Sequence, residues 1–414
     1  MFIIYYQYFI VFALVIILIN FIINMIFFKN IKNFKLPTKF IDSPPLISVL
    51  IPARNEESNI KKLLVSLIKQ DYKNLEILVL DDNSIDSTAA IVKRMESKDS
   101  RIKLINGKRL EEGWLGKSWA CHQLASYANG QYFIFTDADT LHFPDTASKA
   151  LAAIVQNNLD GLSVYPRQIM VTFAERMLVS FIGIGLFTMM PLVLVKKTKG
   201  KFFSTGIGQF FMFKKEVYFK SGGHESVKAE ILEDVHLSKR IKAAGFSYMV
   251  FDGSSNIFCR MYKNFREAIS GFSKFIFAAF DYNGVSEAIA IAFFSMLFLV
   301  PFILLPITFI FEWSKILVIL NIIQILLVFT IKIIISLRFK ERILDIFLTP
   351  VSLCFIIAVA VNSYIQARLK KGVYWKGRIY DVNTPEKISL VNDDCYEHDL
   401  SEELNAIKDI KPKV

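Results

Sequence analysis

Residues 132–139 are Tyr132-Phe133-Ile134-Phe135-Thr136-Asp137-Ala138-Asp139, an apolar run that leads into two carboxylates. β-Branched and aromatic residues in succession are typical of a buried strand, and carboxylates are rarely buried inside one. We therefore expect a central strand that reaches the surface at its C-terminal end and places Asp137 and Asp139 at the rim of a sheet. In open α/β sheets this rim is where ligands bind.

The spacing of these two carboxylates suggests a cation between them, because like charges this close repel each other. A divalent ion such as Mg²⁺ or Mn²⁺, bound to oxygen ligands and to a diphosphate, is the natural candidate. The same Asp-x-Asp pattern also occurs in ordinary surface turns. Other features of the sequence are therefore needed to distinguish a metal site from a turn.

Short apolar segments alternate with helical periodicity on the N-terminal side of this stretch. The expected strands cover residues 46–51, 75–80, 102–105 and 132–136. The segments between them repeat apolar residues at helical spacing. This alternation predicts an α/β domain over residues 44–280, with a mostly parallel central sheet and helices on both faces.

Polar residues follow the first two expected strands at the points where they end. These residues are Arg54, Asn55 and Glu56 after the first strand and Asp81 and Asp82 after the second. Adjacent ends of parallel strands line one crevice, where such groups can hold the base or ribose of a nucleotide. A solvated turn and a helix-capping turn are the alternatives.

Two further candidates lie at expected helix starts. Lys117 follows Gly116, a position suited to a phosphate, although isolated Gly-Lys pairs are common. Glu233 and Asp234 open a later helix, where a carboxylate could remove or balance the proton of an acceptor. Acidic residues also favour the first turn of a helix for electrostatic reasons alone.

Apolar segments at both ends predict a multi-pass membrane protein. Residues 2–28 are long enough to span a bilayer, and Lys29, Lys32 and Lys35 follow them. The positive-inside rule then places the N-terminus outside and the next residues in the cytoplasm. We expect an anchor over residues 1–30, a membrane region over 288–366 and a charged cytoplasmic tail over 367–414, in the plasma membrane.

Within the membrane region, residues 288–311 and 316–335 are each long enough to cross. Residues 344–365 are more polar and have basic residues on both sides, so we expect a re-entrant or interfacial hairpin there. Residues 177–195 are apolar too, but a crossing would separate Asp137 and Asp139 from Asp234. We therefore predict a membrane-associated helical hairpin over residues 170–200.

Charge and cysteine content limit the partners. The chain has 414 residues, 49 Lys and Arg against 38 Asp and Glu, and a net charge of +11. This balance suits cytoplasmic loops beside anionic lipids, and no motif indicates nucleic acid as a partner. The four cysteines have no metal-ligand spacing and are expected to be reduced and structural.

Five motifs together resemble family 2 glycosyltransferases over residues 46–280, with a further match in the tail segment 375–380. The motifs are Pro52-Ala53-Arg54-Asn55-Glu56, Asp81-Asp82-Asn83-Ser84, Asp137-Ala138-Asp139, Gly222-Gly223-His224 and Glu233-Asp234. Within the family, the pattern is most similar to membrane enzymes that glycosylate the carotenoid diaponeurosporenoate. Hopanoid-associated and ceramide glucosyltransferases come next.

The resemblance implies a GT-A fold, a UDP-sugar donor, a divalent metal and inversion at the anomeric carbon. It assigns uridine binding to Asp82 with Asp81 nearby, and the metal and diphosphate to Asp139 and Asp137. It assigns the base to Asp234 with Glu233 beside it. The acceptor side is assigned to Gly222, Gly223 and His224.

One motif departs from the family pattern. Many members carry Gln/Arg-x-x-Arg-Trp after the base, whereas this chain has Gly271-Phe272-Ser273-Lys274-Phe275. A processive polymerase is therefore not expected, and Lys274 becomes a candidate phosphate contact. The expected reaction moves glucose to a membrane lipid, with a carotenoid carboxylate first and hopanoid, ceramide, diacylglycerol or polyprenyl phosphate as alternatives. A non-catalytic nucleotide-sugar-binding protein is the alternative of another class.

Overall fold

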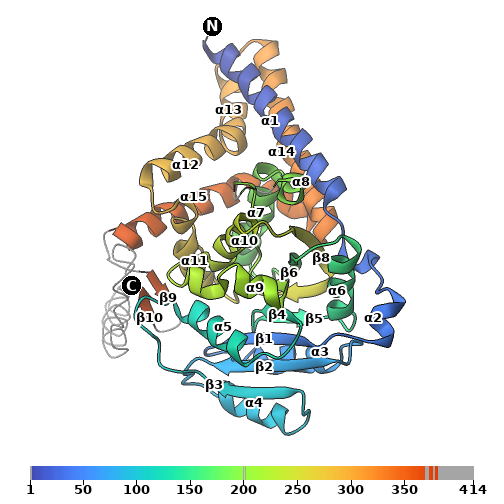
Figure 1. Ribbon diagram of the computed structural model, residues 1–414. Coiled ribbons are helices and arrows are strands. Elements are labelled where there is room, and N and C mark those ends of the chain that lie inside the picture. Colours follow the sequence, from blue (N-terminus) through green and yellow to red (C-terminus); the bar gives the residue numbers. More distant parts are fainter. Residues whose placement is uncertain (1, 199, 201, 369–372, 376–377, 381–414) are drawn as a thin grey trace, which may run out of the picture.

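The computed structural model describes residues 2–198, 200, 202–368, 373–375 and 378–380. An α/β domain forms the lower part of the molecule in Figure 1, and a group of apolar helices rises above it. The predicted tail over residues 367–414 lies almost entirely outside the described residues. Only its first residues and two short strands, β9 (Val373–Trp375) and β10 (Arg378–Tyr380), belong to them.

The centre of the domain is an eight-stranded mixed sheet with the strand order β3-β2-β1-β4-β7-β6-β8-β5. Its strands are β1 (Ile47–Ala53), β2 (Leu75–Asp81), β3 (Ile102–Asn106), β4 (Tyr132–Thr136), β5 (Thr140–His142), β6 (Gly161–Gln168), β7 (Phe210–Lys214) and β8 (Tyr248–Cys259). The first four strands run parallel, as predicted, and β7 is antiparallel to β4 and β6.

The register of the parallel strands brings the predicted site residues to one edge. Ile47 of β1 pairs with Leu75 of β2 and with Tyr132 of β4. The side chains of β2 are buried along its whole length, and β4 is buried from its second residue onward. All three strands therefore end at the same edge, and the polar residues after them lie side by side.

Helices cover both faces of the sheet, as the alternation predicts. One face packs against α3 (Ile60–Ile68), α4 (Thr88–Glu96) and α6 (Thr146–Gln156). The other packs against α5 (Gly116–Tyr127), α7 (Phe173–Met189) and α10 (Glu233–Ala243). Shorter or peripheral helices are α2 (Thr38–Asp42), α8 (Leu192–Lys197), α9 (Lys215–Lys220) and α11 (Phe265–Phe275).

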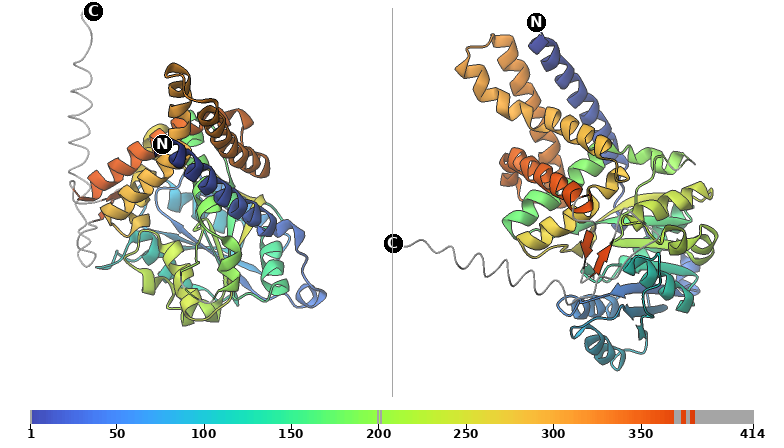
Figure 2. Two further views of the ribbon diagram at one scale, coloured as in Figure 1. Left: turned by 90° about the horizontal axis from the view of Figure 1, so that it is seen from above. Right: turned by 90° about the vertical axis from the view of Figure 1, so that its left-hand side faces the viewer.

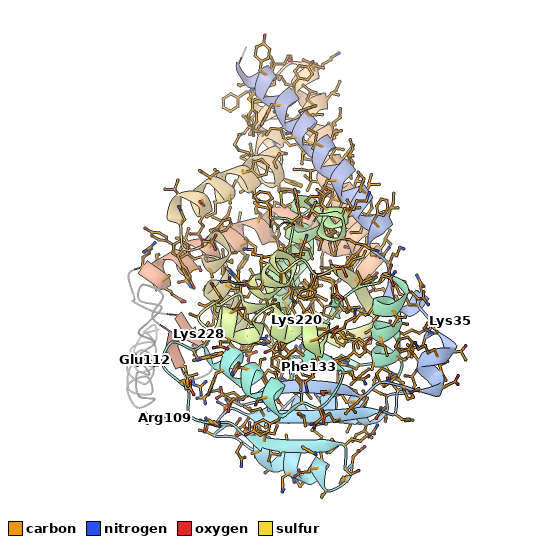
Figure 3. All side chains as sticks on the ribbon, viewed as in Figure 1. Lys35, Arg109, Glu112, Phe133, Lys220 and Lys228 are labelled. Atoms are coloured by element: carbon orange, nitrogen blue, oxygen red, sulfur yellow. The ribbon has the colours of Figure 1, made fainter. Side chains whose placement is uncertain are left out.

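The apolar helices beyond the sheet are α1 (Phe2–Phe27), α12 (Gly284–Phe298), α13 (Val300–Ile310), α14 (Lys315–Phe339) and α15 (Thr349–Arg368). Three segments among the described residues are long and apolar enough to cross a membrane, namely Ile3–Phe27, Lys315–Phe339 and Ile343–Arg368. Their outward side chains are largely apolar (Figure 3), with Phe12, Ile319 and Phe347 exposed by 65%, 52% and 61%. The predicted N-terminal anchor is thus a single helix of spanning length.

Residues 288–311, which are long enough to cross, do not form one continuous helix. The helix breaks at Leu299, so that α12 and α13 are separate. Pro301 lies in the first turn of α13, where its missing N–H costs nothing, but it could not continue α12. Segments 265–280 and 284–298 also meet at a bend of 108°.

The hairpin predicted over residues 344–365 is wrong. A short 3₁₀ turn, Ile343–Leu348, leads into α15, which is one uninterrupted helix. Pro350 sits in its first turn and therefore causes no break. In Figures 1 and 2, α15 lies across the foot of the upright helices α1, α13 and α14. An interfacial position for this helix stays a prediction.

The apolar segment over residues 177–195 is divided between α7 and α8 at Pro191. None of the spanning segments found in the described part of the chain includes it. Asn24 of α1 satisfies the backbone at the break. Its Nδ2 donates to the carbonyls of Phe187 (2.8 Å) and Met190 (2.7 Å), and its Oδ1 accepts from the N–H of Leu192 (2.8 Å). The predicted contact with the membrane surface remains a prediction.

The apolar helices are joined to the sheet by Arg338 at the end of α14. Its Nε donates to Asp252 of β8 at 2.9 Å, and its Nη2 donates to the carbonyl of Phe28 at 2.6 Å. The backbone N–H of Asp252 donates to the carbonyl of Lys29 at 3.0 Å. The C-terminal ends of α1 and α14 therefore meet β8 at one buried carboxylate.

We expect Arg338→Met to lower the free energy of unfolding by about 3 kcal/mol, because it leaves a buried carboxylate without its cation. Asp252 is only 1% exposed. The measurement is thermal unfolding of the detergent-solubilised protein. Arg342→Met is the control, since Arg342 is exposed just beyond the same end of α14. Equal melting temperatures for the two variants would contradict this assignment.

Candidate active site

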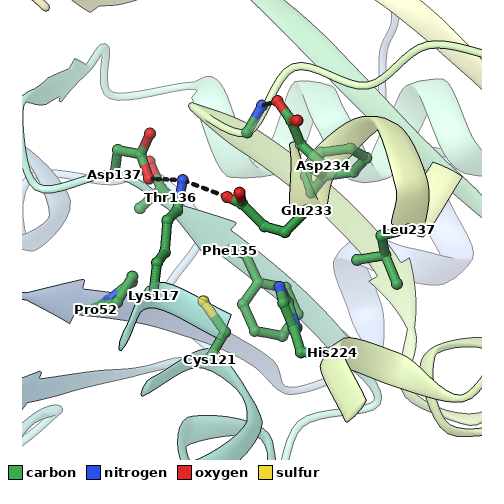
Figure 4. A pocket seen from close by; sticks show the side chains of 12 residues that line it. Pro52, Lys117, Cys121, Phe135, Thr136, Asp137, His224, Glu233, Asp234 and Leu237 are labelled. Carbon is green, nitrogen blue, oxygen red and sulfur yellow. Dashed lines mark hydrogen bonds and ion pairs between the residues drawn. The ribbon is translucent and has the colours of Figure 1, made fainter. Parts of the chain in front are cut away.

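A small pocket lies at the edge where the parallel strands end (Figure 4). It is lined by Pro52, Lys117, Cys121, Phe135, Thr136, Asp137, Gly208, Phe211, His224, Glu233, Asp234 and Leu237. The lining comes from strand ends, from the start of α5 and from the start of α10. The fold thus brings Asp137, Glu233 and Asp234 to one site, as predicted.

Lys117 connects two of the predicted carboxylate motifs. Its Nζ is 2.8 Å from Asp137 Oδ1 and 2.8 Å from Glu233 Oε1 (Figure 4). Burial disfavours the charged amine, but the two carboxylates outweigh it and raise the pKa of Lys117 well above its ordinary value. Lys117 is therefore a fixed cation beside the Asp-x-Asp pair.

Glu233 and Asp234 are neighbours in sequence with different ionisation. Burial raises the pKa of Glu233, but its ion pair with Lys117 more than offsets this and lowers it. Burial, and then the charge of Glu233, raise the pKa of Asp234 to about 6. Two carboxyl groups whose pKa values are pushed apart are typical of a site that uses one as a base.

Backbone amides hold the carboxylate of Asp234. Its Oδ2 accepts from the N–H of Gly208 at 2.8 Å, and its Oδ1 accepts from the N–H of Val235 at 2.8 Å. A Cβ on Gly208 would lie 3.1 Å from Asp234 Oδ2 and 3.2 Å from Lys117 Nζ. Gly208 therefore allows this close approach, a role that sequence reasoning missed. The signal available was the Gly206-Ile207-Gly208 segment before β7.

The polar residues after β1 form hydrogen bonds that hold the turn after β2 in place. Arg54 Nη1 donates to the carbonyls of Asp82 (2.8 Å) and Asn83 (2.9 Å). Asn55 Oδ1 accepts from the backbone N–H of Ile85 at 3.0 Å, and the N–H of Glu56 donates to Thr88 at 2.8 Å. The structure thus gives these predicted nucleotide contacts a role in shaping the crevice.

Asp81 and Asp82 differ in what they contact. Both carboxylate oxygens of Asp82 accept from Arg378, at 2.6 Å and 3.0 Å. Asp81 Oδ2 accepts from the N–H of Ser84 at 3.2 Å, whereas its Oδ1 is buried without a hydrogen bond among the described residues. Asp81 Oδ1 is therefore an acceptor atom that no hydrogen bond within the described part of the chain uses. Arg378 was not predicted, because 296 positions separate it from Asp82.

The predicted metal ligands supply suitable donor atoms. Asp137 is 27% exposed in its side chain, and Asp139 Oδ1 lies 3.6 Å from the sulfur of Cys259. Among the described residues, no group of three or more His, Cys, Asp or Glu could hold a metal. Magnesium is commonly bound by one or two carboxylates that share it with substrate phosphates and water. The residues present fit that mode.

The residues predicted for the acceptor side form a tight turn beside the pocket. Gly222 and Gly223 have φ values of +88° and +50°, which favour glycine. His224 is buried, with Nδ1 2.9 Å from the hydroxyl of Tyr218, and burial lowers its pKa to about 3. His224 is therefore neutral.

Lys274 on α11 lies close enough to lower the pKa of Glu233. The predicted contact of Lys274 with a phosphate stays a prediction.

Residues 48–221 match the family described as glycosyl transferase family 2. The chain is 32% identical over 239 residues to a 4,4'-diaponeurosporenoate glycosyltransferase of Staphylococcus haemolyticus (strain JCSC1435). It is 29% identical over 238 residues to the enzyme of that name from Staphylococcus aureus (strain MRSA252). Each alignment covers 55% of this chain and 60% of the relative.

The chain also matches two solved structures at TM-scores below 0.5. One is the mannosyltransferase PcManGT from Pyrobaculum calidifontis in complex with GDP-Man and Mn²⁺, with a TM-score of 0.46, 17% identity, and coverage of 86% of this chain and 97% of that one. The other is S. aureus TarS 1–349 in complex with UDP-GlcNAc, with a TM-score of 0.39, 16% identity, and coverage of 84% and 98%. Residues 48–221 are thus similar in sequence to glycosyl transferase family 2, as the motifs predict, and the mixed α/β sheet agrees with the predicted fold class.

Proposed function

We propose that this protein is an inverting glycosyltransferase that moves glucose from a UDP-sugar to a membrane lipid. The preferred acceptor is a carotenoid carboxylate such as diaponeurosporenoate, the compound that the relatives are named for. The observation that carries the proposal is the pocket in which Lys117 joins Asp137 to Glu233 beside Asp234. This arrangement places a cation and a candidate base at the edge where a donor would bind.

In the proposed reaction, an acceptor oxygen attacks the anomeric carbon while the bond from that carbon to the diphosphate breaks. Asp234 takes the proton of an acceptor hydroxyl, or orients an acceptor carboxylate that is already ionised. Lys117 keeps Glu233 ionised and adds positive charge beside the departing diphosphate. A divalent ion held by Asp137 and Asp139 supplies further positive charge when bound.

The nucleotide is proposed to bind across the ends of β1 and β2. The unpartnered Oδ1 of Asp81 can accept a hydrogen bond from the N–H of the base, because a buried acceptor without a partner is costly to leave unpaired. Arg54, Asn55 and Glu56 hold the turn that carries it. The sugar then extends toward Lys117 and the acceptor side at His224.

The proposed topology is that of a plasma-membrane protein with a cytoplasmic active site. The N-terminus of α1 and the turn between α13 and α14 lie together at the end away from the sheet (Figure 2). Helix α1, the broken pair α12–α13 and helix α14 would then cross, and α15 would lie along the cytoplasmic surface. This arrangement keeps the active site and the lipid acceptor on one side.

The test uses the full-length protein in detergent with UDP-glucose, diaponeurosporenoate and Mg²⁺ or Mn²⁺. We expect UDP release and a glucosylated carotenoid by mass spectrometry. Chelation with EDTA should lower the rate by at least ~10-fold, and added metal should restore it, because the metal balances the charge of the leaving diphosphate.

Two outcomes would redirect the assignment. Lipid extracts from cells with and without the protein would be compared by mass spectrometry. A glycosylated lipid other than the carotenoid, found only with the protein, would identify the acceptor as hopanoid, ceramide, diacylglycerol or polyprenyl phosphate instead. A folded protein that binds UDP-glucose but releases no UDP with any metal or lipid extract would instead be a nucleotide-sugar-binding protein without turnover.

A further inference from the structure

The C-terminal hairpin reaches the nucleotide edge of the sheet from the far end of the chain. Strands β9 and β10 pair with each other after α15, and β9 contacts α11. Arg378 of β10 donates from Nη1 to Asp82 Oδ2 at 2.6 Å and from Nη2 to Asp82 Oδ1 at 3.0 Å. Both side chains are nearly buried, with 7% and 5% exposed. This contact is a bidentate ion pair at the end of β2.

A buried ion pair of this kind contributes little net free energy to holding the C-terminal segment against the sheet. Removing two charges from water costs several kcal/mol per ion, and apolar residues often do as well or better. The pair instead fixes the orientation of the Asp82 carboxylate, because a planar guanidinium that binds both oxygens fixes the carboxylate plane. The backbone of Asp82 is fixed as well, through the hydrogen bond from Arg54 to its carbonyl. Asp82 is therefore held at both its side chain and its main chain.

We propose that Arg378 is a positioning residue for the donor nucleotide, acting through Asp82. This inference rests on the proposed function, since it concerns the UDP-sugar site. Arg378 fixes the Asp82 carboxylate next to Asp81 Oδ1, which has no hydrogen bond among the described residues and can accept one from the base. The segment around Arg378, outside the 48–221 family match, thereby completes the crevice.

Charge gives a second reason for this role. Asp81 and Asp82 place two adjacent carboxylates near the bound nucleotide, whose diphosphate is also negative. The guanidinium of Arg378 neutralises one of them at close range. Without it, one more uncompensated negative charge would lie at the site, and repulsion between like charges weakens binding of the anion. The expected effect is on donor affinity rather than on the chemical step.

The experiment compares Arg378→Met, Arg378→Lys, Asp82→Asn and the Arg378→Met/Asp82→Asn double variant in the full-length protein. UDP affinity is measured by calorimetry, and the KM for UDP-glucose and kcat are measured separately. We expect Arg378→Met to raise the Kd of UDP and the donor KM by about tenfold, with kcat within about twofold, and Arg378→Lys to have a smaller effect. In the Asp82→Asn background, the loss of Arg378 should matter less.

Arg368→Met is the matched control, because Arg368 is an exposed cation at the end of α15 that donates to the carbonyl of Tyr282. An unchanged Kd and KM in Arg378→Met would overturn the proposal, as would tighter UDP binding or a fall in kcat alone. If the methionine variant does not fold, the lysine variant decides by the same two constants. Failure of the wild-type protein to bind UDP would count against the proposed function instead.

Discussion

With a hydroxyl acceptor, replacing Asp234 by asparagine is expected to lower kcat by ~10²–10⁴-fold, because the site then has no group to take the hydroxyl proton, whereas an ionised carboxylate acceptor needs no base and should be affected less. The donor KM should change less than kcat, since Asp234 lies on α10 and not on the turns after β1 and β2 where the nucleotide is proposed to bind. Both carboxylate oxygens of Asp234 accept backbone N–H groups, so the amide of asparagine would also disturb the turn at Gly208. Single-turnover measurements at saturating donor would separate the chemical step from binding.

The assignment of Asp234 as the base also determines how the rate of the wild-type enzyme depends on pH. Asp234 has a pKa raised to about 6 by burial and by Glu233, and only its ionised form can take a proton. Activity should therefore fall as the pH drops below about 6 and level off above it on this limb. Glu230→Gln is the control for Asp234→Asn, since Glu230 is half-exposed just before α10 and pairs with His236. Near-normal transfer by a folded Asp234→Asn variant would exclude Asp234 as the base.

Replacing Lys117 by methionine is expected to lower kcat/KM for the donor by ~10²–10³-fold, as for loss of a preorganised charge that stabilises a leaving group. The variant would leave Asp137 and Glu233 facing the diphosphate without the amine that now lies 2.8 Å from each. The apparent pKa of the Glu233–Asp234 pair should rise, because a neighbouring cation has been removed. The acid limb of the pH–rate profile would then move to higher pH.

The shift of the acid limb distinguishes this role from a general loss of structure. Lys93→Met provides the comparison, since Lys93 is 73% exposed and pairs with Glu96 on α4, away from the pocket. It should leave both the rate and the pH profile unchanged. If Lys117→Met kept the wild-type acid limb, Lys117 could not be the group that separates the ionisation of Glu233 and Asp234.

The parallel half of the sheet could be predicted because its signals are local. Each strand of that half is a short apolar run followed by polar residues, and the strand register then brings Asp137, Asp81 and Asp82 to one edge. The contact of Lys117 with Glu233 and that of Arg378 with Asp82 could not be predicted. Each joins positions more than 100 residues apart, and side-chain pairing across such separations has no periodic pattern in the sequence.

The membrane region was predicted less well, and the reason is again physical. Hydropathy measures composition, so it counted residues 288–311 as one span although Pro301 ends the helical continuity there. In residues 344–365, polar residues and Pro350 suggested a hairpin, yet a proline in the first turn of a helix is compatible with a straight helix. The position of a proline relative to a helix start, rather than its presence, decided both outcomes.

The packing of α1 against α14 has a consequence for the order in which the protein assembles. Gln7 of α1 is hydrogen-bonded in the buried interface to Gln324 of α14, 317 positions later. During synthesis, α1 is made first, and its polar partner does not exist until the catalytic domain has been completed. The N-terminal helix is therefore made well before the glutamine that it contacts in the folded protein.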